Sequence, residues 1–322
     1  DASHYLLIPE SVATPESTEQ VSTLLAEHFK SRSPITFRSG GTSLSGQSLS
    51  DSVLMDSRNN FKKIEIKDGG KVITVQPGIS VREINNRLKP YGYKFGPDPA
   101  SEIAATVGGV IANNSSGMVC GTEENAYKTI LSAQIIFSDG SSLDTAAFDA
   151  ESRLKAIQPD LFDVILTQKK HIDASAVMKA EIKRQFRGKN TMGYSLNAFI
   201  DYSSPVDILL HLMVGSEGTL AYIAEATFRT IPLKPFAATN LLVFNSLAAA
   251  NASLTALVES GAAAIELLDK TSLQVAQRED RAMAELKVLA IESHAALIVE
   301  YQELTEEALN RRISASEKVI NN

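Results

Sequence analysis

The sequence predicts an α+β fold in two domains, residues 1–236 and 237–322. Short β-like runs alternate with helical apolar stripes through the first part of the chain. Pro232 and Pro235 mark a boundary, and a different succession of strands and helices follows it. A length of 322 residues also suits two domains better than one small core.

The first elements are a helix and several short strands. Thr14 is suited to a helix cap and Pro15 to the first helical position, and Val21, Leu25 and Phe29 then follow helical spacing. Strands are expected at ITFR, SVLM, KIEI and KVITVQP, which turn residues separate.

A second helix is predicted by a capping box. Ser80 and Glu83 have the spacing in which each side chain satisfies the other's backbone N–H. Pro90 and Gly92 mark the end of this helix.

The segment from Gly96 to Ile130 is rich in small residues and is expected to contain a helix that includes Gly108 and Gly109. A glycine inside a helix costs about 1 kcal/mol relative to alanine. Two in succession therefore indicate close approach of either another backbone or a flat ligand. The residues alone leave both alternatives open.

The rest of the first domain reads as a hairpin, a helical region and a helix–strand pair. Asp139-Gly140 is a typical hairpin turn, and residues 149–186 have a helical, charged pattern. Ser204 and Pro205 start a helix that ends at GSEG, and TLAYIAEATFRTI then alternates as a strand.

The second domain shows the order strand, helix, strand and helix. LLVF and ALIVEYQ are the strands, an Ala-rich run is the first helix, and Thr305 is the expected cap of the second. Because no final strand follows, we expect a domain cut short.

Composition excludes several classes of protein. The net charge of −7 disfavours nonspecific nucleic-acid binding, and Cys120, the single cysteine, excludes an internal disulfide and a cysteine-ligated cluster or zinc site. The chain has no run of about 18 apolar residues and no signal-peptide pattern at its start. We therefore expect neither a membrane span nor a secretory leader.

The stretch FRSGGTSLSGQ, Phe37 to Gln47, is the first candidate for a binding site. It holds three glycines and several hydroxyl side chains directly after a strand. Glycine permits positive φ, so consecutive N–H groups can converge on an anion. The stretch matches neither G-x-x-x-x-G-K-[ST] nor G-x-G-x-x-G, which predicts a phosphate cradle of another type.

The order of the motifs is more informative than any one of them. RSGGTSLSGQ, VQPG, GPDPAS, TVGGVIANNSSG, SDG and GSEGTL follow one another between about residues 5 and 234. In this order they resemble the FAD-binding domain of the FAD-linked oxidase family, the fold of vanillyl-alcohol oxidase and p-cresol methylhydroxylase (PCMH). KNTMGYSLNAFIDY and HLMVGSEGTLAYIAEATFRTIP are similar to the D-lactate dehydrogenases that carry an iron–sulfur half.

The resemblance implies a PCMH-type FAD-binding domain of two α+β subdomains over residues 1–236. The start of a ferredoxin-like α+β cap domain would follow. The cofactor-binding residues that it implies are Ser39, Gly40, Gly41, Thr42, Ser43, Gly46, Pro97, Asp98, Ser101, Thr106, Val107, Gly108, Gly109, Asn113, Ser116, Gly117, Gly121, Glu217 and Ile223. Some relatives have a covalent flavin-linking His where this chain has Thr42, so noncovalent FAD is expected. No metal site is expected.

The activity implied is FAD-dependent oxidation of a D-2-hydroxy acid, with D-lactate preferred, to the 2-oxo acid. Hydride would pass to flavin N5. Electrons would then pass to iron–sulfur centres, absent from this chain, and to a quinone or cytochrome. The catalytic base stays unknown, and Arg187, Lys189 and Asn190 are the substrate-side candidates. The implied location is the cytoplasm or the inner face of the cytoplasmic membrane.

Three alternatives remain open. The first is a glycolate or D-2-hydroxyglutarate dehydrogenase of the same family. The second is an NADPH-dependent UDP-N-acetylenolpyruvoylglucosamine reductase, whose usual C-terminal pattern is not seen after residue 237. The third is a non-catalytic FAD-binding fragment or subunit.

Overall fold

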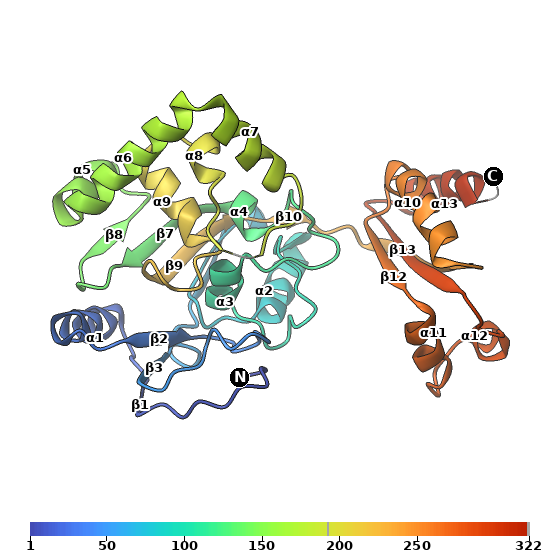
Figure 1. The fold of residues 1–322 in the computed structure, drawn as a ribbon, viewed down its shortest axis with the longest axis horizontal. Helices are drawn as coiled ribbons and strands as arrows, with labels where there is room; N and C mark the ends of the chain where they lie inside the picture. Colours follow the sequence, from blue (N-terminus) through green and yellow to red (C-terminus); the bar gives the residue numbers. More distant parts are fainter. Residues whose placement is uncertain (192, 321–322) are drawn as a thin grey trace. The chain divides into compact units, whose positions relative to one another are not determined.

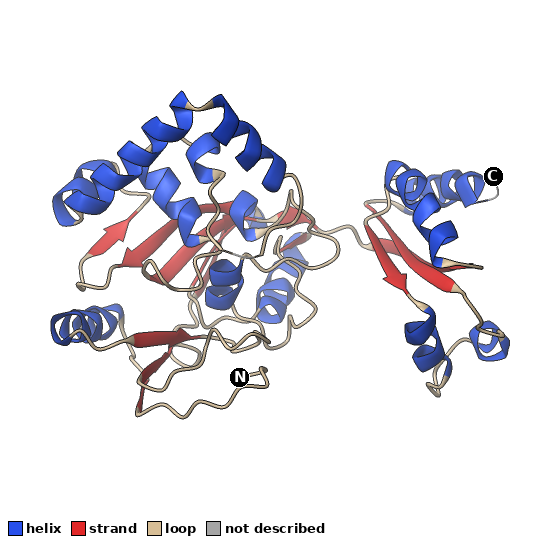
Figure 2. Ribbon diagram, viewed as in Figure 1, coloured by secondary structure: helices blue, strands red, loops and turns tan. Residues whose placement is uncertain are grey.

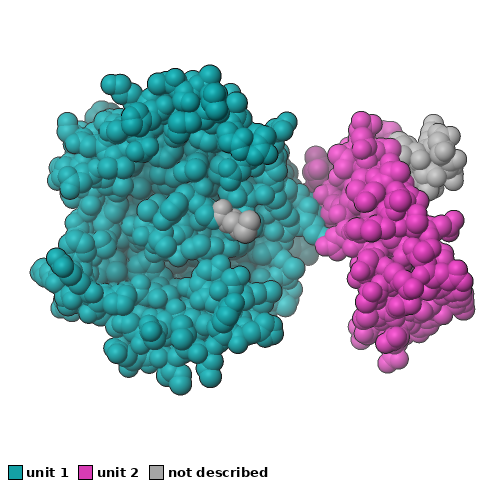
Figure 3. All heavy atoms as spheres, in the orientation of Figure 1, with its two compact units in different colours: residues 1–232 teal, residues 233–322 magenta. Residues whose placement is uncertain are grey.

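The chain folds into two compact units, Asp1–Pro232 and Leu233–Asn322, coloured teal and magenta in Figure 3. The structure is a computed structural model, and it describes residues 1–191 and 193–320. The division follows Pro232, the first proline of the pair, and lies four residues before the expected limit at residue 236. Both units mix helix and strand, as predicted (Figure 2).

Unit 1 begins with a small parallel sheet. Its strands, in the order β1–β3–β2, are β1 (Ser11–Ala13), β3 (Val53–Asp56) and β2 (Ile35–Arg38). Helix α1 (Thr18–Ser31) packs Val21 and Leu25 into a core that also includes Met55 of β3 and Tyr222. The glycine-rich stretch leaves this sheet at the end of β2.

The first helix starts later than its sequence predicts. Ser17, not Thr14, is the N-cap, and its hydroxyl accepts a hydrogen bond from the N–H of Gln20 at 3.3 Å. The carbonyls of Thr14 and Pro15 instead accept bonds from the side-chain amide of Asn60. This contact with a distant residue keeps Thr14 and Pro15 outside the helix.

A larger antiparallel sheet forms the centre of unit 1. Its strands, in the order β4–β5–β9–β7–β8, are β4 (Ile64–Lys67), β5 (Val72–Val75), β9 (Tyr222–Arg229), β7 (Ile130–Ile136) and β8 (Ser142–Asp144). The Asp139-Gly140 turn joins β7 and β8, which confirms the predicted hairpin. A short pair, β6 (Tyr93–Lys94) and β10 (Ile231–Pro232), completes the strands of unit 1.

Eight α-helices of unit 1 pack their apolar residues into one core with this sheet (Figure 1). They are α2 (Val81–Leu88), α3 (Val107–Asn113), α4 (Ala126–Thr129), α5 (Ala150–Ile157), α6 (Pro159–Ala174), α7 (Ala176–Gln185), α8 (Ala198–Asp201) and α9 (Pro205–Met213). Short 3₁₀ turns lie at Asp68–Gly70 and Lys89–Tyr91. The predicted caps of α2 and α9 are confirmed, because the hydroxyls of Ser80 and Ser204 accept N–H bonds from the first turns.

Unit 2 is a three-stranded antiparallel sheet with helices packed on it. The strands, in the order β11–β13–β12, are β11 (Phe236–Phe244), β13 (Ala295–Glu303) and β12 (Ala264–Leu268). The helices are α10 (Leu247–Glu259), α11 (Lys270–Gln277), α12 (Ala284–Val288) and α13 (Glu306–Ile320). The expected order of strand, helix, strand and helix is confirmed for β11, α10, β13 and α13. The elements β12, α11 and α12 were not predicted.

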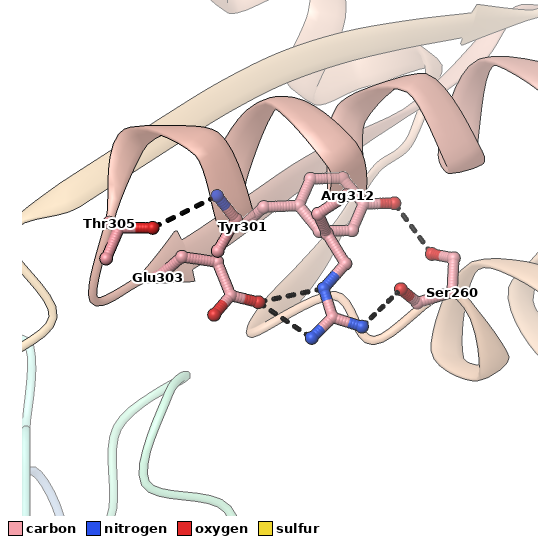
Figure 4. A network of polar contacts seen from close by, with 6 residues as sticks. Ser260, Tyr301, Glu303, Thr305 and Arg312 are labelled. Atoms are coloured by element: carbon pink, nitrogen blue, oxygen red, sulfur yellow. Dashed lines mark hydrogen bonds and ion pairs between the residues drawn. The ribbon is translucent and has the colours of Figure 1, made fainter.

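A polar network joins α13 to the sheet of unit 2 (Figure 4). The guanidinium of Arg312 donates two hydrogen bonds to one carboxylate oxygen of Glu303, at 2.9 and 2.7 Å, and a third to the carbonyl of Ser260. The hydroxyls of Ser260 and Tyr301 lie 2.7 Å apart. Thr305 caps the helix, as predicted. No helix of the described residues is long and apolar enough to cross a membrane.

Candidate functional site

Unit 1 contains a cleft of about 520 Å³, here called the central cleft. Its walls come from the end of β2 and the loop after it, from α3, and from the turn between α9 and β9. This volume lies in the range of small-molecule and cofactor sites. Hydroxyl groups and glycines make up much of the lining.

The loop after β2 presents free donors to the central cleft. Among the described residues, none accepts a hydrogen bond from the backbone N–H groups of Gly40 to Leu44, and all five residues line the cleft. Gly41 has a φ of 65°, in the left-handed region that glycine adopts without strain. Consecutive free N–H groups of this kind form a binding site for an anion.

Arg38 adds a positive charge beneath this loop. It ends β2 and lines the central cleft, and its Nε is buried with no hydrogen-bond partner among the described residues. A Cβ on Gly41 would lie 3.0 Å from this atom, so glycine makes room for the guanidinium. Sequence reasoning did not select Arg38. Its position directly before the glycine-rich loop was the available signal.

The other hydroxyls beside the loop have different roles. Ser39 donates a hydrogen bond to the carbonyl of Pro77 at 2.7 Å and also contacts the hydroxyl of Thr106, the N-cap of α3. These bonds attach the loop to α3. The hydroxyl of Ser116 is buried in the cleft wall with no partner among the described residues, so it is free to bind a ligand.

The two glycines of α3 meet different surroundings. A Cβ on Gly108 would lie 2.8 Å from the ring of Pro77, so this glycine allows close packing within the protein. A Cβ on Gly109 would meet no atom within 4 Å, and Gly109 lines the central cleft. Of the two alternatives left open by the sequence, Gly108 fits the packing of protein atoms. Gly109 leaves open space for a ligand.

Glu217 holds a carboxyl group at the other wall. Its Oε1 accepts a hydrogen bond of 2.7 Å from the side-chain amide of Asn113, and its own N–H donates to the carbonyl of Ala112. Burial raises the pKa of Glu217 above its ordinary value, and the bond from Asn113 offsets part of this rise. Its φ of 53° is unusual for a residue with a side chain and costs about 1–2 kcal/mol.

The structure brings thirteen of the nineteen predicted cofactor residues together in the central cleft. They are Ser39, Gly40, Gly41, Thr42, Ser43, Ser101, Thr106, Gly108, Gly109, Asn113, Ser116, Glu217 and Ile223. The other six do not line it: Gly46, Pro97, Asp98, Val107, Gly117 and Gly121. Sequence reasoning missed further lining residues, of which Arg38, Pro77, Thr191 and Tyr222 matter most here.

Asp98 shapes the wall from behind. Its carboxylate accepts hydrogen bonds from the backbone N–H groups of Gly117 at 2.9 Å, Val119 at 2.9 Å and Cys120 at 3.2 Å. Gly117 in turn packs against the backbone of Asp98. These two predicted residues therefore hold the segment 117–120 in place, and neither lines the cleft.

The same contacts suppress the reactivity of Cys120. Burial, together with the charge of Asp98, raises the pKa of this thiol to about 11. At pH 8 we expect iodoacetamide to alkylate the folded chain at least about 100-fold more slowly than the chain in urea, because the thiolate is the nucleophile. Mass spectrometry of timed samples measures both rates. The Asp98→Asn variant should react faster than the wild type when folded; equal rates would show that Asp98 has no part in the effect.

The three substrate-side candidates lie on a loop beside a second cavity of about 350 Å³. Arg187 and Asn190 line this second cavity, and the amine of Lys189 donates to the carbonyl of Gly117. Thr191, the next residue, lines the central cleft. No group of three or more His, Cys, Asp or Glu residues in the described parts of the chain could hold a metal ion.

Comparisons with known proteins agree with this geometry. The profile of a family described as "FAD binding domain" matches residues 9–146. D-2-hydroxyglutarate dehydrogenase of Pantoea ananatis is 29% identical over 290 residues, which cover 87% of this chain and 28% of that enzyme. D-lactate dehydrogenase of Archaeoglobus fulgidus is 27% identical over 222 residues, 69% of this chain and 38% of that enzyme.

A solved structure shows the same fold. Alkyldihydroxyacetonephosphate synthase superposes with a TM-score of 0.67 over 97% of this chain and 52% of its own, at 16% sequence identity. The matched part of this chain spans 28% of the length of the first of these curated relatives and 38% of the length of the second. The order of the sequence motifs, the FAD-binding profile and these relatives agree: residues 9–146 match an FAD-binding domain, and the chain is similar to FAD-linked 2-hydroxy-acid dehydrogenases.

Proposed function

We propose that the central cleft binds FAD and that the protein oxidises a D-2-hydroxy acid to the 2-oxo acid, with D-lactate preferred. The observation that most supports FAD as the cofactor is the run of free N–H groups from Gly40 to Leu44. The unpartnered Nε of Arg38 lies beneath this run. A diphosphate has the charge and the acceptor oxygens that such a site needs.

The residues present fit FAD. The loop and Arg38 would hold the pyrophosphate, Ser116 offers a free hydroxyl, and Gly109 leaves the space that a flat ring requires. Thr42 lines the cleft and has no nucleophilic nitrogen, which supports noncovalent binding. Of the six predicted residues outside the lining, Asp98 and Gly117 act on the cleft through its wall, because they hold the segment 117–120 in place.

FAD, when bound, supplies the hydride acceptor for the oxidation. The chain's own contribution is to bind and orient the cofactor through the residues above. We assign no catalytic base. Arg187, Lys189 and Asn190 stay substrate-side candidates, because Thr191 connects their loop to the central cleft.

The domain plan and the partners are also proposals. The antiparallel order β11–β13–β12 is that of the first three strands of a ferredoxin-like β-α-β-β-α-β unit, which supports a cap domain of that type after residue 236. Electron transfer through iron–sulfur centres to a quinone or cytochrome rests on the family resemblance alone. So does a location in the cytoplasm or on the inner face of its membrane.

An anaerobic spectral titration tests the function. The chain is purified, mixed with FAD, freed of excess cofactor and exposed in turn to D-lactate, D-2-hydroxyglutarate and glycolate. We expect bound flavin with bands at about 370 and 450 nm, which D-lactate bleaches fastest. Denaturation should release the flavin into the supernatant, as noncovalent binding requires.

The other outcomes separate the alternatives. The similarity to the Pantoea ananatis enzyme makes D-2-hydroxyglutarate the second candidate substrate. If that acid bleaches the flavin faster than D-lactate does, it becomes the preferred substrate. Bleaching by NADPH would favour the reductase. Bound flavin that no 2-hydroxy acid reduces would make this chain an FAD-binding fragment without turnover. Failure to bind FAD would refute the assignment of the cleft.

A further inference from the structure

The central cleft has few groups that can balance the charge of a ligand. Among the described residues that line it, the titratable ones are Arg38, Glu217 and Tyr222. Burial raises the pKa of the Tyr222 phenol, so this residue stays neutral. Among the described lining residues, one guanidinium and one carboxyl group therefore carry the charge.

Two charged groups behind the wall, Asp98 and Lys189, make their hydrogen bonds to backbone groups and do not line the cleft. The carboxylate of Asp98 is turned to the N–H groups of Gly117, Val119 and Cys120. The amine of Lys189 binds the carbonyl of Gly117. Helix α3 offers Glu217 only the neutral amide of Asn113.

We propose that Glu217 takes up a proton when FAD enters the central cleft, so that a neutral carboxyl group faces the bound cofactor. This inference rests on the proposed assignment of the cleft to FAD. The pyrophosphate brings two negative charges, of which Arg38 offsets one. An ionised Glu217 would add a third negative charge in a partly desolvated space, and protonation removes it at the lowest cost.

The backbone supports a role for this side chain. Gly215 and Gly218, on either side, also have positive φ, and they adopt it without strain. Glu217 also has a positive φ, which costs energy because it carries a side chain. Such strained residues cluster at functional sites. Burial already shifts the pKa of the carboxyl upward before any ligand is present, so protonation needs only a further shift in the same direction.

Calorimetric titration of the chain with FAD measures the proton directly. At pH 7.5, the binding enthalpy is measured in phosphate and in Tris, and the difference gives the number of protons exchanged. We expect a net uptake approaching one proton by the wild type and none by Glu217→Gln. The Kd of the wild type should rise by up to about tenfold per pH unit above neutrality, while that of Glu217→Gln stays constant.

A matched control and a second measurement make the test decisive. Glu225→Gln removes a carboxylate from β9 outside the cleft and should behave like the wild type. On the unaltered chain, a difference infrared spectrum should gain a protonated-carboxyl band when FAD is added, whether or not Glu217→Gln folds. FAD binding with no proton uptake and no such band would overturn the inference. Absence of FAD binding would instead refute the proposed function.

Discussion

The Gly117→Ala variant is expected to lose roughly 3–5 kcal/mol of unfolding free energy. A Cβ at this position would lie 1.7 Å from the carbonyl oxygen of Asp98. The carbonyl belongs to the backbone and the Cβ has no rotatable bond, so the segment 117–120 has to move. Its movement breaks the three N–H bonds to the Asp98 carboxylate. Urea denaturation followed by circular dichroism measures the change.

Gly109→Ala is the matched control, because Gly109 also lies beside the central cleft but has free space around it. A Cβ there meets no atom within 4 Å, and the position is inside α3. We expect this variant to gain about 0.5–1 kcal/mol, since alanine is the better helix former. If FAD occupies the cleft, the same methyl group weakens FAD binding. A Gly117→Ala chain as stable as the wild type would contradict the role given to Asp98.

Replacing Arg38 by methionine is expected to raise the Kd for FAD about 100-fold, which corresponds to about 2.7 kcal/mol of binding free energy. Arg38 is the one cation among the described residues that line the central cleft. Its Nε has no hydrogen-bond partner among the described residues, so the substitution should leave the unfolding free energy nearly unchanged. Fluorescence titration with FAD and urea denaturation measure the two quantities separately.

Two further variants identify the cause of the effect. Arg58→Met removes an exposed arginine that pairs with Asp56 outside the cleft, so FAD binding should not change. Arg38→Lys keeps the charge but loses the planar pair of donors, so it should recover only part of the affinity. A Kd within threefold of the wild type for Arg38→Met would show that the pyrophosphate lies elsewhere.

The sequence was sufficient for elements whose signals are local. Ser80 and Ser204 cap their helices because each hydroxyl lies within one turn of the N–H that it accepts. Ser17 displaced Thr14 as a cap because Asn60 holds the preceding carbonyls, and this contact spans more than forty residues. Strand β12 was missed for a similar reason, since it forms by pairing with β13 about thirty residues later.

The site could be predicted in its loops but not in its charges. Glycines and hydroxyls identified the loop after β2 and the helix α3. Arg38 was missed because an arginine at the end of a strand is usually solvated, and only the fold shows its Nε buried beneath Gly41. Gly108 and Gly109 differ by about 100° around the helix axis, so their different neighbours became visible only in three dimensions.

The walls of the central cleft are far apart along the chain, from Phe37 to Ile223. The sheet that supports them depends on the pairing of β5 with β9, in which Val72 lies opposite Arg229. Contacts of such long sequence separation form slowly during folding. During synthesis, β9 must emerge from the ribosome before the walls of the cleft can assemble. A nascent chain that ends before β9 therefore has the glycine-rich loop but no complete site. We expect unit 1 to bind its ligand only late in folding, after β9 has paired with β5.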